Sequence, residues 1–465
     1  MSAPADGRAS RAPRPLFRWA ARVTLLLAMG ALAIATLPEK MPLGWSSEGA
    51  LHVRGLTLPS EARILVLSPH PDDDVLGCGG LIVAARRHGT PVEVVYLTNG
   101  DANEWSFLRH AHHPALTPRA VLRMGDVRRD EAISGESALG VGRENLIFLG
   151  YPDFGCMHIL ESHWRDAPPY TALFTRASAV PYPYAQTPGA PYNAASVLAD
   201  LSRVLETFRP TDIFVSHPCD LNGDHRALFV FTQAAVWHSR EHPRLHSFPV
   251  HADGWPRPPG LHDALLQMVP PPLQEPGVWE SAPLDLAQVS AKRAALDAHR
   301  TQLSYSADYL HSFVRRNEIF DGTEALRLTP ESPLGFGAQS AGIAGQEWRY
   351  VRLKEECIEL SMVYSRPVAR ETRAVVRMFA DRDDRAFAAC PKITVTVDPL
   401  GAHLEDGTSR APAAQVRITR DHRRTTVAVP LALLGDPQRL LISAESSLGE
   451  SRLDRADWTS LTLSR

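Results

Sequence analysis

Apolar runs and amphipathic segments alternate along much of the chain. Four short runs rich in apolar and β-branched residues predict buried strands at residues 63–67, 92–97, 145–149 and 212–216. Apolar positions three and four residues apart predict helices at 80–88, 126–139, 194–208 and 286–305. Strands that alternate with helices form parallel sheets. We therefore expect an α/β fold, a Rossmann-like, mostly parallel sheet with flanking helices, over residues 56–325.

The pattern changes towards the C-terminus. Residues 322–345 are rich in Gly, Ser and Pro and predict a boundary. Beyond them apolar residues alternate with polar ones, as at Ile393, Val395 and Val397. Short alternating strands with turns between them predict an all-β sandwich domain over residues 346–465. Three of its aromatic residues are either sugar-stacking platforms or core: Trp348, Tyr364 and Trp458.

The first 55 residues differ from the rest. Five arginines between residues 8 and 22 precede residues 23–38, which carry no charge. This pattern is typical of a secretory signal peptide or a membrane anchor, followed by a linker, although the run is shorter than the about 20 residues of a bilayer span. A buried core helix is the alternative. We expect a protein that is exported or membrane-anchored, with the α/β domain outside the cytoplasm and membrane contact through the apolar segment.

Composition excludes several classes of protein. The 465 residues are 44% hydrophobic and 22% charged, enough to bury a full core. Lys and Arg number 49 against 52 Asp and Glu, a net charge of −3, so we expect no nucleic-acid partner. The five cysteines are dispersed, which excludes a CxxC zinc module and a disulfide scaffold.

Candidate chemistry gathers at the ends of two predicted strands. Residues 68–74, SPHPDDD, follow the first strand, and residues 216–225, SHPCDLNGDH, follow the fourth. Crowded carboxylates beside a histidine favour a bound cation, and ligands in α/β sheets bind at the carboxyl ends of strands. His70 and Asp73 can face one ion while Asp72 points elsewhere. Each segment alone is also compatible with an acidic turn or a helix cap.

Two histidines and one carboxylate would leave a coordination position open for water or substrate, which is typical of a catalytic metal site. A further carboxylate could act as general base. The same ligand types also suit an iron oxygenase, although the predicted parallel strands disfavour it. Gly77, Gly79 and Gly80 do not form a dinucleotide fingerprint, because Ile82 occupies the position of the last glycine. We expect these glycines to permit close packing.

These motifs together resemble the LmbE-like, or PIG-L, family of zinc-dependent N-acetylglucosaminyl deacetylases. The resemblance covers residues 63–316 and rests on SPHPDDDVLGCGG, Arg128-x-x-Glu131, LGYPD and DLNGDHRA. It implies a metal site of His70, Asp73 and His225 for zinc, or for another divalent metal such as Fe²⁺. It also implies that Asp72 is the general base and that Arg128 contacts substrate, although Arg128 could instead pair with Glu131.

Two positions depart from the family pattern. Asp74 stands where a glutamate is usual, and Asn222 stands where many members have a histidine. An amide can donate a hydrogen bond to an oxyanion but supplies no proton, so Asn222 is expected to bind substrate while Asp72 or His217 protonates the leaving amine. The expected function is removal of the N-acetyl group from an N-acetylated amino sugar or glycoconjugate. The alternative is an envelope-tethered glycan-binding or scaffold protein with a degenerate site.

Overall fold

The computed structural model describes residues 53–102, 117–164, 167–261, 266–271, 278–322, 325–329, 334–335, 346–364, 366–407, 409–412 and 414–464. The predicted signal or anchor segment lies outside these residues. Within the described ranges, no helix combines the length and the apolar character needed to cross a bilayer.

An eight-stranded sheet forms the centre of the first half of the chain, with the strand order β1-β7-β8-β6-β5-β2-β3-β4. Its strands are β1 (Arg54–Gly55), β2 (Ile64–Ser68), β3 (Val92–Thr98), β4 (Leu146–Tyr151), β5 (Asp212–Ser216), β6 (Arg244–Phe248), β7 (Trp279–Pro283) and β8 (Asn317–Asp321). Only β8 pairs antiparallel with its neighbours β6 and β7. The prediction of a mostly parallel sheet is therefore confirmed.

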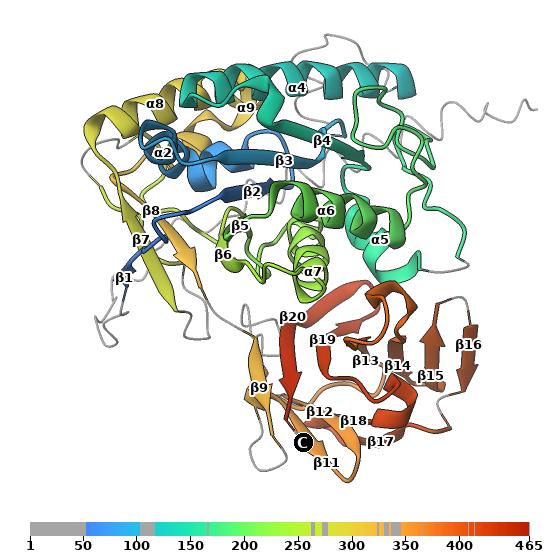
Figure 1. Ribbon diagram of the computed structural model, residues 1–465. Coiled ribbons are helices and arrows are strands. Elements are labelled where there is room, and N and C mark those ends of the chain that lie inside the picture. Colours follow the sequence, from blue (N-terminus) through green and yellow to red (C-terminus); the bar gives the residue numbers. More distant parts are fainter. Residues whose placement is uncertain are drawn as a thin grey trace, which may run out of the picture. The chain divides into compact units, whose positions relative to one another are not determined.

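Helices cover both faces of this sheet (Figure 1). They are α2 (Asp73–Arg87), α4 (Pro118–Leu139), α5 (Cys156–Ser162), α6 (Ala194–Phe208), α7 (Gly223–Trp237), α8 (Leu286–Leu296) and α9 (Arg300–His311). Alternate residues of β2 point to opposite faces, so Ile64 and Val66 join one buried cluster with residues of α2 and α8, and Leu65 and Leu67 join another with α6 and α7.

Three helices differ from their expected bounds. Helix α4 begins at Pro118, eight residues before its expected start at residue 126. Helix α2 begins at Asp73, seven residues before the predicted start, with Asp73 and Asp74 in its first turn, where carboxylates favour the positive end of a helix. The single helix expected over 286–305 is two helices, α8 and α9, and α9 itself has a non-helical residue at Ser306. Apolar spacing continues across the break between α8 and α9 and across Ser306, so the sequence pattern did not reveal either irregularity.

The glycines of α2 permit close packing, as expected. A Cβ atom would lie 2.3 Å from the Phe248 ring at Gly77, and 2.4 Å from the Leu284 side chain at Gly80. At Gly79 it would lie 3.0 Å from Cγ of Lys292. The absence of side chains therefore lets α2 approach both β6 and α8.

A buried ion pair crosses this glycine face. Nζ of Lys292 donates to Oε1 of Glu318 at 2.7 Å and to the backbone oxygen of Leu76 at 2.8 Å. The Glu318 carboxylate also accepts from the backbone N–H groups of Gly80 and Leu81, at 2.7 and 2.8 Å. Both charged side chains are almost completely buried. The pair thus connects α2, α8 and β8.

Two further sheets follow. One has the order β10-β11-β12-β18-β17 and the other β16-β15-β14-β13-β19-β20-β9. Their bounds are β9 (Leu326–Leu328), β10 (Leu334–Gly335), β11 (Gln346–Lys354), β12 (Cys357–Tyr364), β13 (Arg373–Asp381), β14 (Lys392–Asp398), β15 (Gly401–Asp406), β16 (Ser409–Pro412), β17 (Arg417–Arg420), β18 (Arg424–Pro430), β19 (Arg439–Leu448) and β20 (Ser451–Leu463). Both sheets contribute to one buried cluster, in which Leu360 and Val427 pack with Val376 and Ile442. Tyr364 and Trp458 are buried, which favours the core interpretation of these aromatic residues over sugar-stacking platforms.

The C-terminal sheets also pack against the α/β region. Phe379, Phe387 and Trp458 belong to the same buried cluster as residues of α5, α6 and α7. Nζ of Lys392 lies 4.9 Å from the ring centroid of Trp164 and 3.9 Å from that of Phe387. The two regions therefore share apolar core, and a lysine held over aromatic rings lies at their junction.

Candidate metal and active site

The site lies at the carboxyl ends of β2 and β5. These strands are neighbours in the sheet and run parallel, so the segments that follow them meet at one edge although they are far apart in sequence. His70 and Asp72 lie in the turn after β2, and Asp73 begins α2. His225 lies in the first turn of α7, which follows β5. The predicted convergence of the two motifs is present.

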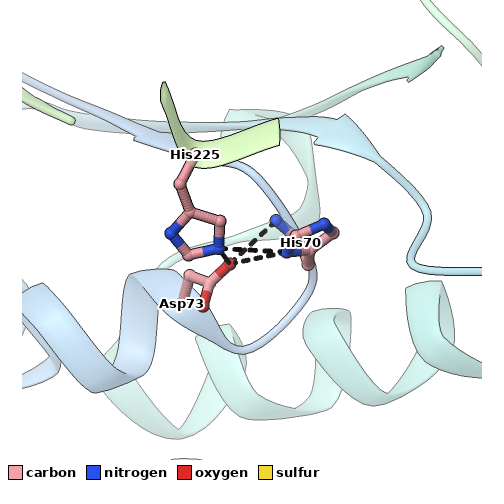
Figure 2. A group of neighbouring side chains, drawn as sticks. All are labelled: His70, Asp73 and His225. Carbon is pink, nitrogen blue, oxygen red and sulfur yellow. Dashed lines mark hydrogen bonds and ion pairs between the residues drawn. The ribbon is translucent and has the colours of Figure 1, made fainter. Parts of the chain in front are cut away.

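Three candidate ligand atoms form a compact triangle, shown in Figure 2. Oδ2 of Asp73 lies 3.0 Å from Nδ1 of His70 and 3.0 Å from Nε2 of His225. The two histidine nitrogens are 3.2 Å apart. Ligands about 2.0–2.1 Å from a tetrahedral zinc ion lie about 3.3 Å from one another. The separations and the donor types therefore fit a small divalent cation.

In each histidine, the ring nitrogen that is not part of the triangle contacts at least one carboxylate. Nε2 of His70 lies 3.2 Å from Oδ1 of Asp153 and 3.3 Å from Oδ2 of Asp224. Nδ1 of His225 lies 3.1 Å from Oδ2 of Asp220. Carboxylates in these positions orient metal-ligating histidines and increase their basicity. We did not identify Asp220 and Asp224 as supporting residues from the sequence, although both belong to the motif after β5.

The buried charges of the triangle shift one another's pKa values. Burial alone would lower the pKa of His225, but Asp220 and Asp73 outweigh it and raise the pKa to about 9. Burial likewise opposes protonation of His70, yet Asp153, Asp224 and Asp73 raise its pKa well above the usual range. The pKa of Asp73 lies well below its usual range, because the histidines outweigh burial. Positive charge is thus favoured at this point, whether supplied by protons or by a cation.

Asp72 has an unusual backbone and a perturbed carboxyl group. Its φ of 143° is rare for a residue other than glycine, and such conformations concentrate at functional sites. Burial raises its pKa to about 7, although the nearby Arg128 acts in the opposite direction. A carboxyl group with a pKa near neutrality is well suited to accept and return a proton. Asp72 lines the same cavity as His70 and Asp73.

Arg128 reaches the base from α4. Its Nη2 donates to Oδ1 of Asp72 at 3.2 Å and to the backbone oxygen of Pro71 at 2.9 Å, while Nη1 donates to the backbone oxygen of Gly100 at 2.9 Å. The side chain is buried and lines the cavity. The alternative of a surface pair with Glu131 is wrong, because Glu131 instead accepts hydrogen bonds from Thr301.

Asn222 lines the cavity at the start of α7. Its Oδ1 accepts from the backbone N–H of Asp224 at 2.9 Å, so the side-chain NH₂ remains as a hydrogen-bond donor. His217, the alternative proton donor, does not line this cavity: its Nδ1 accepts from the N–H of Cys219, and its Nε2 lies 3.2 Å from Asp321. The position of His217 therefore gives no support to the alternative in which it protonates the leaving amine.

Asp74 stabilises the turn that carries Asp72 through hydrogen bonds. Its Oδ2 accepts from the Tyr96 hydroxyl at 2.7 Å, and its Oδ1 accepts from the backbone N–H of Asp72 at 3.2 Å. Its own N–H donates to Oγ of Ser68 at 3.0 Å. The shorter acid at this position thus supports the backbone of the site rather than its cavity.

The remaining wall of the cavity comes from α9 and from the segment after β6. These elements contribute polar and aromatic groups that had not been singled out from the sequence, namely His251, Gln302, Tyr305, Ser306 and Tyr309. Phe154 and Asp153, which follow β4, close another side.

Comparison with known families agrees with the motifs. Residues 65–236 match the family described as PIG-L: GlcNAc-PI de-N-acetylase, so the family resemblance predicted from the sequence is confirmed. A 1D-myo-inositol 2-acetamido-2-deoxy-alpha-D-glucopyranoside deacetylase of Rhodococcus jostii (strain RHA1) is 28% identical over 270 residues, which cover 53% of this chain and 83% of that protein. The protein of the same description from Mycobacterium sp. (strain KMS) is 28% identical, over 53% of this chain and 76% of the relative.

Solved structures are more distant. The N,N'-diacetylchitobiose deacetylase of Pyrococcus horikoshii is 17% identical, with a TM-score of 0.36 over 56% of this chain and 83% of that one. The conserved protein TT1542 of Thermus thermophilus is 19% identical, with a TM-score of 0.35 over 58% of this chain and 99% of that one.

Proposed function

We propose that this chain, whose residues 65–236 match the PIG-L family, is a metal-dependent hydrolase that removes the acetyl group from an N-acetylated amino sugar or glycoconjugate. The observation that carries the proposal is the triangle of His70, Asp73 and His225 beside a buried carboxyl group, Asp72, in one cavity. The deacetylase activity for which the Rhodococcus and Mycobacterium relatives are named supports the substrate class.

The residues of the chain divide the work of amide hydrolysis. A divalent cation such as zinc, held by the triangle, would polarise the acetamide carbonyl and make water more acidic. Asp72 accepts the proton of the attacking water, because its pKa lies close to neutrality. The NH₂ group of Asn222 donates a hydrogen bond to the carbonyl oxygen as it gains negative charge. Asp72 then returns the proton to the departing nitrogen, giving a free amine and acetic acid, which ionises to acetate.

Arg128 holds the base in position. It donates to Asp72, to the backbone oxygen of Pro71 in the same turn and to that of Gly100 after β3. It therefore restricts the carboxylate while leaving one of its oxygens, Oδ2, for water. The same guanidinium lines the cavity, which is compatible with the substrate contact that the family resemblance implies.

The test is elemental analysis of the purified full chain together with acetate release from N-acetylglucosamine, N,N'-diacetylchitobiose and an N-acetylglucosaminyl-inositol. We expect about one divalent ion per chain and hydrolysis of at least one substrate. Asp72→Asn should retain the metal and lose about 10²- to 10⁴-fold in rate, the usual contribution of a general base. Asp384→Asn, an exposed acid in the C-terminal region, is the matched control and should leave both unchanged.

Metal binding without acetate release from any of these compounds would contradict the proposed activity, and full activity of Asp72→Asn would contradict the role of the base. The alternative of a glycan-binding scaffold with a degenerate site gains no support from the cavity, where a ligand set and a base are both present.

Export remains part of the proposal. The basic segment and the uncharged run of residues 23–38 support it. Fractionation of cells that express the full chain would test it: recovery in the cytoplasmic fraction alone would contradict export.

A further inference from the structure

His251 is a cavity residue to which the proposed mechanism gives no part. It follows β6, and its backbone N–H donates to Oδ2 of Asp220 at 2.9 Å. The same carboxylate oxygen lies 3.1 Å from His225, and the rings of His251 and His225 are 4.9 Å apart between centroids. His251 is therefore fixed close to the candidate metal ligands, and it lines the cavity with Asn222 and Tyr309.

The contact with Tyr309 determines which nitrogen of His251 carries the proton. The Tyr309 hydroxyl donates its single proton to the backbone oxygen of Val250 at 2.7 Å. The same oxygen lies 3.3 Å from Nδ1 of His251, and the two rings are stacked with an interplanar angle of 11°. Because the hydroxyl proton is already used, this second contact is a hydrogen bond only when Nδ1–H donates to the tyrosine oxygen.

The other ring nitrogen is consequently an acceptor. A neutral histidine with its proton on Nδ1 has a lone pair on Nε2. Within the described part of the chain, no hydrogen bond engages Nε2 of His251. The cavity therefore contains an oriented acceptor without a protein partner.

We infer that His251 is a substrate-binding residue that accepts a hydrogen bond from a ring hydroxyl of the amino sugar through Nε2, an inference that rests on the proposed deacetylase function. Hydroxyl groups are the donors that a sugar carries in greatest number, and Gln302, Tyr305 and Ser306 place further polar groups along the same wall. Deacetylation leaves the ring hydroxyls unchanged, so this bond forms equally in the ground state and the transition state. It should influence KM rather than kcat.

The test compares three replacements, because asparagine and glutamine present their amide groups at different distances from the backbone. The glutamine amide reaches the position of Nε2 and supplies an acceptor there, whereas the asparagine amide reaches only the position of Nδ1. We expect His251→Asn and His251→Leu to raise KM about 2- to 12-fold, the value of one net hydrogen bond, with kcat changed less than twofold. His251→Gln should remain close to the unmodified chain.

Binding is measured separately by calorimetry with N-acetylglucosamine and N,N'-diacetylchitobiose in the Asp72→Asn background, where hydrolysis of the sugars is slowed. The His251→Asn change should raise the dissociation constant by the same factor, with metal content unchanged. His403→Asn, in strand β15 of the C-terminal region, is the matched control and should leave binding and KM as they are.

The outcomes separate the two proposals. Unchanged sugar binding in His251→Asn overturns the role of His251 alone. A fall in kcat with KM unchanged does the same, as does a KM for His251→Gln that is raised as much as the KM of His251→Leu. Failure of the Asp72→Asn parent to bind either sugar overturns the proposed substrate class and this inference together.

Discussion

Replacing Glu318 of β8 with glutamine should destabilise the protein far more than an exposed substitution between α2 and α8. The carboxylate accepts from Nζ of Lys292 and from two backbone N–H groups of α2, and it is almost completely buried. In the Glu318→Gln variant the ammonium of Lys292 is buried without a counter-charge. Breaking a buried ion pair in this way costs about 3–5 kcal/mol.

The glutamine amide also fits its surroundings poorly. It has one oxygen for three donors, and its NH₂ group must face either an ammonium or an N–H group. Lys292→Met leaves Glu318 buried without its cation and should be similarly costly. The double variant Lys292→Met/Glu318→Gln should lose less than the sum of the single losses, because it leaves neither side chain carrying an unpaired charge.

The assay is urea unfolding followed by tryptophan fluorescence, with hydrogen exchange of the α2 amides as a local measurement. Arg87→Met is the matched control: Arg87 joins the same two helices through Asp285, but both side chains are about half exposed. An exposed pair contributes about 0–1 kcal/mol. The reasoning is refuted when Glu318→Gln costs no more than Arg87→Met, or when the two single losses add in full.

Three further changes concern the site. Asp220→Asn removes the carboxylate beside His225 and should weaken metal binding about 10- to 100-fold in competition with a chelator; an unchanged affinity would contradict its orienting role. Arg128→Lys cannot reproduce the fork that holds the Asp72 turn, so kcat should fall about 10- to 100-fold, equivalent to about 1.5–3 kcal/mol, with metal content retained. Gly77→Ala places a methyl group 2.3 Å from the Phe248 ring and should cost about 1–3 kcal/mol in urea unfolding, recovered in part by Phe248→Leu.

The parts of the fold that could be predicted are those with strong local patterns. The bounds expected for α6 and β5 agree with the structure, because an amphipathic helix and a fully buried strand both have clear signatures. Strand β7, with the sequence WESAP, has no such pattern, and its place beside β8 depends on antiparallel pairing far along the chain. Its position in the sheet therefore could not be derived from local periodicity.

The candidate site likewise combines residues that the sequence patterns could place with residues that they could not. The two segments that carry His70, Asp73 and His225 could be brought together from sequence, because each follows a predicted parallel strand and such strands end at one edge. The choice of these three residues as ligands came from the family resemblance. The roles of neighbouring acids depend on the direction of each side chain, which a run of aspartates does not reveal. Asp74 turns towards Tyr96, and Asp224 turns towards His70. His251 follows a strand that had not been expected, so no motif identified it.

The hydrophobic cluster common to the α/β region and the C-terminal sheets limits how the chain can be divided. Trp164 is almost completely buried, and Phe379 and Phe387 lie against it at centroid distances of 6.0 and 5.7 Å. A fragment ending near residue 325 would leave this indole and the adjoining surfaces of α5 and α7 exposed to water. Recombinant work on the α/β region should therefore retain the C-terminal sheets. A fragment without them would be prone to aggregate, regardless of whether its catalytic groups were intact.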